Sequence, residues 1–339
     1  MATLEQSPGE AKLPIDRKDL IQKFAALAGL VLLIVAFSLT SSAFLTMSNG
    51  VTIALQTSTI AYIGLGATCV IITSGIDLSV GSVLALAGVV AALAVQVGVP
   101  VPFAMLIGIL AGGACGAVNG LIITRMKLPP FIATLGMMMV ARGLALQITG
   151  ARPVSGLGES FGALGNGSLW RVITEGDNGF PKVIFPGIPY PVILMIVLAV
   201  IVAVVLRKTT FGRHLYAIGS NEEAARLSGV KVNKVKIGAY VLSGLLAGLC
   251  GCVLMSRLVT GQPNEGIAYE LDAIAAAVIG GTSLAGGVGS ISGTIIGAFI
   301  IGILRNGLNM NGVSSFIQMI IIGLVIISTV WIDQLRNRK

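Results

Sequence analysis

The chain has 339 residues, of which 55% are hydrophobic and only 11% are charged. A soluble globular protein carries about 25% charged residues to keep its surface solvated, so this composition excludes a soluble enzyme and indicates a membrane-embedded protein. The formal net charge of +8 would also suit a nucleic-acid-binding protein. The positions of the basic residues favour membrane topology instead, and no nucleic-acid partner is expected.

Nine apolar runs follow one another along the chain, each close to the ~20 residues that a helix needs to cross the hydrocarbon of a membrane. They lie at residues 24–40, 51–73, 80–97, 103–124, 131–149, 191–206, 237–258, 291–310 and 316–332. A tenth and weaker run, at 271–284, is too short for a full crossing and is interrupted by Gly280-Gly281, as in a re-entrant segment or half-helix. We therefore expect an all-α integral membrane protein with about ten transmembrane helices, some of them interrupted.

The basic residues test this count, because Lys and Arg concentrate in the cytoplasmic segments of membrane proteins. Most of them fall into four clusters that share one side of the membrane if there are ten crossings, at 12–23, 125–127, 207–236 and 336–339. Both termini are then cytoplasmic, as tails at 1–23 and 336–339 around a single membrane domain at 24–335, and segment 150–189 is a partly ordered external loop. The first run has no small-x-small cleavage site and is interpreted as a retained anchor.

The sequence contains neither the residue spacing of a metal site nor the motif of a nucleotide-hydrolysing protein. The four cysteines, Cys69, Cys115, Cys250 and Cys252, lie within apolar runs, and His214 is the single histidine, so neither a disulfide framework nor a metal site is expected. The G-x-x-x-x-G-K-[S/T] phosphate loop does not occur either. We expect no cofactor in this chain and no ATP hydrolysis by it.

Two glycine-rich segments, 75–81 and 281–287, share the pattern G-x-x-L-[S/A]-x-G. A second pair of matches has the same order along the chain: Asn119-Gly120-Leu121 with Asn306-Gly307-Leu308, and Phe131-Ile132 with Phe316-Ile317. We interpret these matches as a two-fold internal repeat, although Gly/Ala/Leu-rich sequence also gives such matches by chance. Irregular backbone at membrane depth survives only where it lines a cavity or protein, so we expect the transport pathway near residues 74–82 and 280–290.

Acidic side chains within the membrane region need a specific reason, because each costs about 2.5–3.5 kcal/mol at the centre of a spanning helix. Asp77 either caps a helix that begins at Ser79 or Val80 or belongs to the pathway or a gate. Glu270 and Asp272 open the interrupted tenth run, where carboxylates favour a helix N-terminus. Their alternative role is in gating or in contact with an external partner.

Neutral polar side chains inside the apolar runs would suit an uncharged, polyhydroxylated solute, although such side chains also hold helices together. Together with the acidic residues they form the candidate pathway or gate: Gln56, Asp77, Ser79, Asn119, Phe131, Thr134, Asp272, Thr282, Ser283 and Asn306, with Gln318 as a further polar group. Three arginines near the ends of runs, Arg142, Arg257 and Arg305, are expected to reach the headgroups or to pair with an acid. The run at 112–116 predicts close helix packing.

The segment 207–236 contains the most specific motif of the chain, at 211–230, and it predicts a short capped helix. Its candidate residues are Ser220 or Asn221 as the N-cap, Glu222 and Glu223 in the first turn, Ala224 and Ala225 in the middle, Arg226 in the last turn and Gly229 as the stop. A short surface helix has no apolar core of its own. Docking to a soluble partner is therefore favoured over an unattached loop.

The chain resembles the integral-membrane permeases of bacterial ABC sugar importers, of the ribose, xylose, galactose and inositol type. The resemblance covers residues 20–335 and rests on 72–82, 130–136, 211–230, 269–276 and 280–287. The ordered set is most similar to ribose permeases. Residues 223–225 with Gly229 look like the coupling helix of that family, which docks into a cleft on the ATPase subunit.

The resemblance implies a subunit of a larger importer in the bacterial inner membrane. Its partners would be a second copy of the permease, an ATPase subunit that carries two nucleotide-binding modules and binds Mg-ATP, a periplasmic sugar-binding protein and membrane lipid. Transport would follow alternating access, with the energy entering through residues 220–229. The N-terminus and the loop 150–189 depart from the family, which leaves the precise sugar open.

Two other functions are compatible with the sequence. An ion-coupled secondary transporter of a small polar solute would use Asp77 as its leading coupling residue. A membrane receptor or scaffold is disfavoured, because glycine and polar residues are placed within the spans rather than in soluble domains.

Overall fold

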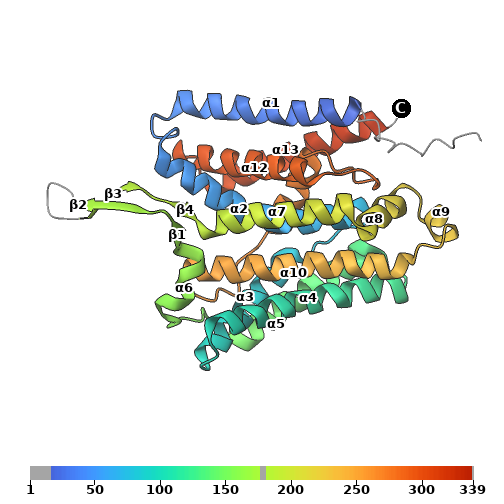
Figure 1. Cartoon of the computed structure of the whole chain (residues 1–339), viewed down its shortest axis with the longest axis horizontal. Coiled ribbons are helices and arrows are strands. Elements are labelled where there is room, and N and C mark those ends of the chain that lie inside the picture. The colour runs from blue at the N-terminus through green and yellow to red at the C-terminus, as the bar shows by residue number, and fades with distance from the viewer. Residues whose placement is uncertain (1–16, 176–180, 338–339) are drawn as a thin grey trace, which may run out of the picture.

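The computed structural model describes residues 17–175 and 181–337, which form a helical bundle with two short strand pairs at one end (Figure 1). The helices are α1 (Arg17–Thr40), α2 (Met47–Ile72), α3 (Val80–Gln96), α4 (Val101–Arg125), α5 (Pro130–Thr149), α6 (Gly158–Asn166), α7 (Tyr190–Lys208), α8 (Thr210–Ser220), α9 (Glu222–Leu227), α10 (Val232–Leu258), α11 (Tyr269–Ile279), α12 (Ile291–Met310) and α13 (Ser315–Asn337). Each of the ten predicted runs overlaps one of these helices. The all-α membrane fold is confirmed.

The helices differ in how much of the membrane they can cross. Six of those in the described residues are long and apolar enough to span it, namely α2, α4, α5, α7, α10 and α12, while the apolar parts of α1, α3 and α13 are shorter. The predicted weak run forms α11, which has 11 residues and at 1.5 Å per residue is roughly 16 Å long. It is too short to cross alone, as its sequence predicts.

The ends of the described chain lie at the same end of the bundle as α8 and α9, here called the α9 end (Figure 1). An even number of crossings requires this arrangement. Helix α1 begins at Arg17, inside the tail expected at 1–23. Residues 1–16 of that tail and 338–339 of the C-terminal tail lie outside the described residues.

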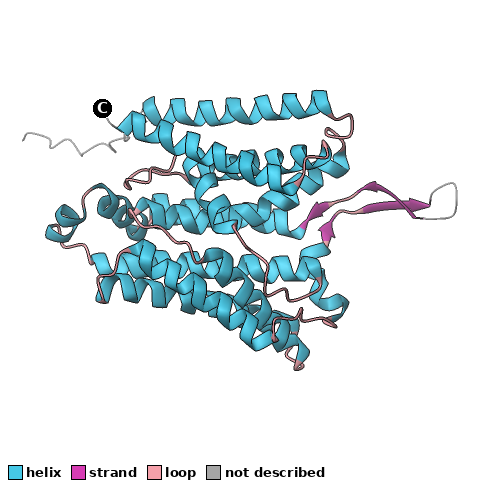
Figure 2. Cartoon of the chain, turned by 180° about the vertical axis from the view of Figure 1, so that it is seen from behind, coloured by secondary structure: helices cyan, strands magenta, loops and turns pink. Residues whose placement is uncertain are grey.

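The opposite end, here called the strand end, carries the segment predicted as an external loop. Its strands are β1 (Ser168–Leu169), β2 (Val172–Glu175), β3 (Pro181–Phe185) and β4 (Ile188–Pro189). They pair antiparallel, β1 with β4 and β2 with β3, and the second pair projects away from the helices (Figure 2). Helix α6 is fixed against α10, because the Gly165 N–H donates to Ser256 Oγ at 2.8 Å. Much of the predicted loop is therefore ordered.

The centre of the bundle is α2, which is buried continuously from Thr57 to Ile72. Beside it α4 and α10 pack with glycine against glycine: a Cβ atom at Gly112 would overlap the Gly244 carbonyl, and one at Gly116 would overlap the Tyr240 carbonyl. Such contact brings two backbones close together. It confirms the close packing predicted from residues 112–116.

Candidate functional site

The two interrupted segments expected to mark the pathway lie against each other. Segment 73–79 joins α2 to α3, and segment 280–290 joins α11 to α12. The Gly287 N–H donates to the Ile72 carbonyl at 2.9 Å, and Ser74 Oγ donates to the Ala285 carbonyl at 2.8 Å. Neither segment is helical, so both place irregular backbone inside the bundle.

Helix α8 ends beside the contact between segments 73–79 and 280–290. A Cβ atom at Gly219, the penultimate residue of α8, would overlap both the Ile72 carbonyl and the Gly287 amide. Only glycine allows three backbone segments to approach so closely. The end of α8 therefore contacts the last residue of α2 and segment 280–290 directly, one residue before Ser220 completes the helix.

Asp77 lies at the centre of a buried polar network and is only 3% exposed. Its Oδ1 accepts from the Ser79 N–H at 3.0 Å and from Ser79 Oγ at 2.6 Å, and its Oδ2 accepts from Ser243 Oγ of α10 at 2.9 Å. Asn119 of α4 donates through Nδ2 to Ser79 Oγ at 2.9 Å. The helix cap predicted for Asp77 is not formed, since α3 has Ser79 as its N-cap and no side-chain cap. The carboxylate instead holds the backbone of the segment before α3 and ties it to α4 and α10.

Thr134 and Phe131, from the start of α5, have different environments. Thr134 is buried and donates through Oγ1 to the Pro130 carbonyl at 2.9 Å, with the Ile76 carbonyl of the interrupted segment at 3.3 Å. Phe131 is 50% exposed on the side of the bundle. The structure therefore brings Thr134, but not Phe131, to the interrupted segment.

Three further predicted polar residues, Asn306, Thr282 and Ser283, lie in two different places in the bundle. Asn306 donates through Nδ2 to Asn49 Oδ1 at 2.9 Å, a bond that joins α12 to α2. Such interhelical bonding is the alternative role of neutral polar groups in a membrane bundle. Thr282 and Ser283 are buried within segment 280–290, at the α9 end of the bundle.

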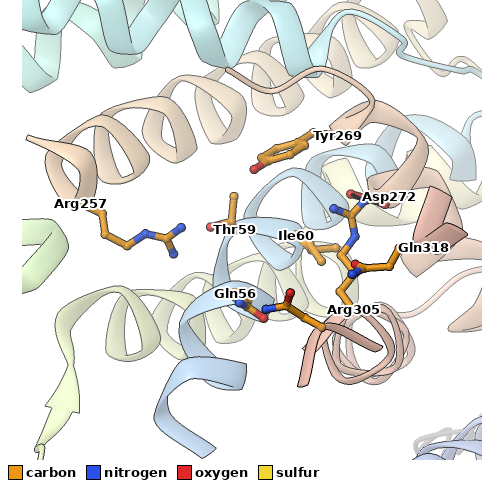
Figure 3. A pocket seen from close by; sticks show the side chains of 9 residues that line it. Gln56, Thr59, Ile60, Arg257, Tyr269, Asp272, Arg305 and Gln318 are labelled. Carbon is orange, nitrogen blue, oxygen red and sulfur yellow. Dashed lines mark hydrogen bonds and ion pairs between the residues drawn. The ribbon is translucent and has the colours of Figure 1, made fainter. Parts of the chain in front are cut away.

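A polar cavity of about 250 Å³ lies at the strand end (Figure 3). Its lining comes from five helices and consists of Gln56, Thr59, Ile60, Arg257, Tyr269, Asp272, Arg305, Asn309 and Gln318. Gln56 and Asp272 were predicted as pathway residues. Tyr269, Asn309 and Thr59 were not, because no local motif marks residues that only the folded helices bring together.

An ion pair organises one wall of this cavity. Arg305 Nη2 lies 2.7 Å and 2.8 Å from the two carboxylate oxygens of Asp272, which is only 2% exposed. The pairing of Arg305 with an acid is confirmed. The capping role considered for Asp272 is wrong, since α11 has Ala268 as its N-cap and no side-chain cap.

The other two predicted arginines, Arg142 and Arg257, make different contacts from Arg305. Arg142 forms no ion pair with an acid among the described residues, and its Nη1 donates to the Pro263 and Glu265 carbonyls at 2.5 Å and 2.7 Å. These bonds hold the non-helical segment before α11. Arg257 forms no ion pair within residues 17–175 and 181–337 and reaches toward the cavity from the side opposite Arg305 (Figure 3).

The predicted capped helix is confirmed as α9. Asn221 is its N-cap, since Asn221 Oδ1 accepts from the Ala224 N–H at 2.9 Å, and Ser220 belongs to α8. Gly229 follows the helix at φ +85°, a conformation that favours glycine. Leu227 is 90% exposed at the tip. A helix with an exposed apolar tip suits docking to another protein.

Glu222 anchors α9 to α10. Its carboxylate accepts from Lys236 Nζ at 2.5 Å and from Arg226 Nη2 at 2.9 Å. Partial burial opposes ionisation, but the bonds from Lys236 and Arg226 outweigh it, so the pKa of Glu222 is lowered from its usual value. A second cavity, of about 320 Å³, lies beside this anchor between α8, α10 and segment 73–79.

Residues 49–330 match the protein family described as the branched-chain amino acid transport system, permease component. This chain belongs to that permease family. The permease is 45% identical over 317 residues to the ribose import permease protein RbsC of Bacillus subtilis, covering 94% of each chain. It is 45% identical to RbsC of Escherichia coli K12, covering 93% of each chain, and 35% identical to the xylose transport system permease protein XylH of the same strain, covering 99% of each.

No solved structure matches the permease. Family membership and the six apolar helices identify a multi-pass protein of the inner membrane. Its relatives are transport subunits rather than enzymes. Nothing in these comparisons supports the ion-coupled alternative, and all three donors around Asp77 come from neutral side chains or backbone.

Proposed function

We propose that this permease is the membrane-spanning subunit of an ATP-driven ABC importer for a monosaccharide or polyol. The solute is a ribose-like pentose or inositol, which a periplasmic binding protein delivers. The observation that carries this proposal is the 45% identity to ribose import permeases over more than nine-tenths of both chains. Two copies of the permease would enclose the pathway.

The energy comes from a separate subunit in this proposal. The chain contains no phosphate loop, so Mg-ATP is bound by an ATPase partner with two nucleotide-binding modules. That partner docks on α9 and moves it. Support comes from the capped geometry of α9, its exposed Leu227 and its anchor through Glu222 to Lys236.

The contact at Gly219 gives this movement a route into the membrane. Helix α8 precedes α9 directly, and its end packs on Ile72, the last residue of α2 before segment 73–79, and on Gly287 in segment 280–290. Docking forces on α9 therefore reach these two places through α8 alone. In an alternating-access cycle these segments change position while the Asp77 network keeps α3, α4 and α10 together.

The orientation of the permease in the membrane follows from the positions of its basic residues. The α9 end carries the cluster at 207–236 and the two ends of the described chain, and it faces the cytoplasm in this proposal. The segment 150–189, with α6 and the strands, then faces the periplasm and the binding protein. The permease domain at 24–335 lies between two cytoplasmic tails, 1–23 and 336–339.

The test is uptake into proteoliposomes that contain the permease and its ATPase, with binding protein loaded with ribose, xylose, galactose or inositol. Uptake of one of these solutes that requires ATP, the ATPase and the binding protein is the expected result. A matched sample with the permease alone and an imposed ion gradient serves as the control. Uptake in that control, at the rate of the complete system, would contradict the proposal.

A further inference from the structure

The β-hairpin at the strand end exposes apolar side chains beyond the ends of the helices. Trp170 is 70% exposed, Ile184 62% and Val172 46%, and Ile184 neighbours Phe185, the register partner of Val172. The pair of β2 and β3 continues past the helices and along their direction (Figures 1 and 2). Since the helices cross the membrane, this hairpin extends out of the hydrocarbon layer into water. Apolar patches exposed to water mark interaction sites.

The base of the hairpin is fixed to the bundle. Strands β1 and β4 pair there, and the Tyr190 N–H donates to the Gly167 carbonyl at 3.0 Å. Tyr62 of the central helix α2 donates through its hydroxyl to the Pro191 carbonyl. A surface that is already ordered loses little conformational entropy when a partner binds, so the hairpin is prepared for docking.

Trp170 has a backbone conformation that is rare for a bulky residue. Its φ of +59° lies in the left-handed region, and it stands between the β1–β4 pair and the β2–β3 pair. Such conformations persist where the surrounding structure holds them, and they concentrate at functional sites. Tryptophan is also among the residues that contribute most to the affinity of protein interfaces.

We propose that the periplasmic sugar-binding protein docks on this part of the hairpin. The docking surface, here called the hairpin surface, consists of Trp170, Arg171, Val172 and Ile184. The inference rests on the proposed function, and it adds the contact residues and the chemistry of the partner's face. That face would present an apolar patch with carboxylates at its rim.

Charge favours the binding protein over a second copy of the permease. Arg171 is exposed between Trp170 and Val172, and it forms no ion pair among the residues whose side chains the structure describes. A contact between two identical surfaces is self-complementary, so it would bring Arg171 toward its own copy, where like charges repel. A partner with carboxylates opposite Arg171 is attracted instead.

The first test is the affinity of the binding protein for the permease–ATPase complex in nanodiscs. The binding protein is loaded in turn with ribose, xylose, galactose and inositol. Trp170→Ala is expected to weaken binding of the loaded protein about 30-fold or more, the loss typical of a central aromatic residue in an interface. Trp331→Ala is the matched control, because Trp331 is the other tryptophan of the chain and is 62% exposed on α13. It should bind normally.

A second variant tests the charge. Arg171→Glu is expected to slow association about 3- to 10-fold at low salt, and the difference should shrink as salt screens the charges. Arg125→Glu, an exposed position at the end of α4, changes the charge at the α9 end and should leave the association rate unchanged. An unaltered thermal midpoint shows that each variant is folded.

A photo-crosslinker shows which molecule covers the hairpin surface. Benzophenone maleimide is attached to the Ile184→Cys permease, and illumination is expected to give an adduct with the binding protein. The unsubstituted permease measures the background from the native cysteines. An adduct only with a second permease or only with lipid would overturn the proposal.

Unchanged binding by both Trp170→Ala and Arg171→Glu would also overturn it. That failure is distinct from failure of the proposed function. A complex whose sugar uptake requires the binding protein, but whose variants bind that protein normally, docks it elsewhere. A complex that imports no sugar with the binding protein fails the uptake test, and the docking proposal fails with it.

Discussion

The two ends of the bundle hold their non-helical segments by different contacts. At the α9 end, backbone packs directly on backbone around Gly219, and the Gly287 N–H and Ser74 Oγ both donate to backbone carbonyls. At the strand end, side chains make the links: Arg305 pairs with Asp272, and Arg142 holds the segment before α11. Each end also has a cavity, of about 320 Å³ at the α9 end and about 250 Å³ at the strand end. Direct backbone contact at the α9 end suits the transmission of movement from α9.

The largest effect is expected from Gly219→Val, because any Cβ there overlaps backbone atoms of two segments. Overpacking costs about 1–3 kcal/mol, so ATP-driven uptake should fall roughly tenfold or more. The permease should still bind the ATPase in a pull-down assay, because α9 is unchanged. Gly143→Ala, which meets no atom within 4 Å, is the control. Normal uptake by the Gly219→Val permease would show that this contact does not transmit movement from α9.

At the strand end, Asp272→Asn should lower the free energy of unfolding by about 2 kcal/mol. Breaking a buried ion pair costs about 3–5 kcal/mol, and the 36% exposure of the Arg305 side chain reduces that value through solvent screening. The measurement is the thermal midpoint of the purified permease in detergent. Glu223→Gln, at an exposed position of α9, should leave the midpoint unchanged, and equal midpoints for both variants would contradict the assignment.

A smaller effect is expected between the two ends, at the Asp77 network. Ser243→Ala removes the donor to Asp77 Oδ2 and should cost about 1.5 kcal/mol of stability, the lower end of the range for a hydrogen bond to a charged group. Ser328→Ala, an exposed hydroxyl of α13 bonded only within its own helix, is the comparison variant. If both lose the same stability in thermal unfolding, Asp77 does not depend on Ser243.

The smallest effect concerns the anchor of α9. Because the folded-state pKa of Glu222 is lowered, its ion pairs stabilise α9 fully above the usual glutamate value of about 4.3, and this contribution is lost as the pH falls through the lower folded pKa. A spin label at Leu227→Cys should therefore become more mobile below about pH 4.3. Glu222→Gln should be mobile already at neutral pH. An identical pH profile in both proteins would exclude Glu222 as the titrating group.

The sequence predicted those structural features that are determined by residues close together in the chain. Each apolar run became a helix, and the spacing of Asn221, Glu222 and Gly229 predicted α9, because cap and stop signals act within one or two turns. The interrupted segments were predicted from their glycines, and their mutual contact was expected only as a shared pathway. The two-fold repeat remains a prediction.

What the sequence did not predict depends on the packing of distant helices. Tyr269 and Asn309 join the cavity only when α11 and α12 fold together, and Gly219 meets Ile72 and Gly287 only through the arrangement of three segments. Asn306 shows the reverse case: its residue type suits a pathway, but its partner Asn49 makes it a link between helices.

The most direct test of transmission from α9 to the interrupted segments is the accessibility of a cysteine at Ser74, an exposed residue bonded to segment 280–290. The Ser74→Cys permease, assembled with its ATPase and binding protein, is labelled with a maleimide in the nucleotide-free state and after trapping with ATP and vanadate. The labelling rate is predicted to differ severalfold between the two states, and Gly219→Val should abolish the difference. An equal rate in both states, in a preparation that imports sugar, would contradict the transmission of movement through this contact.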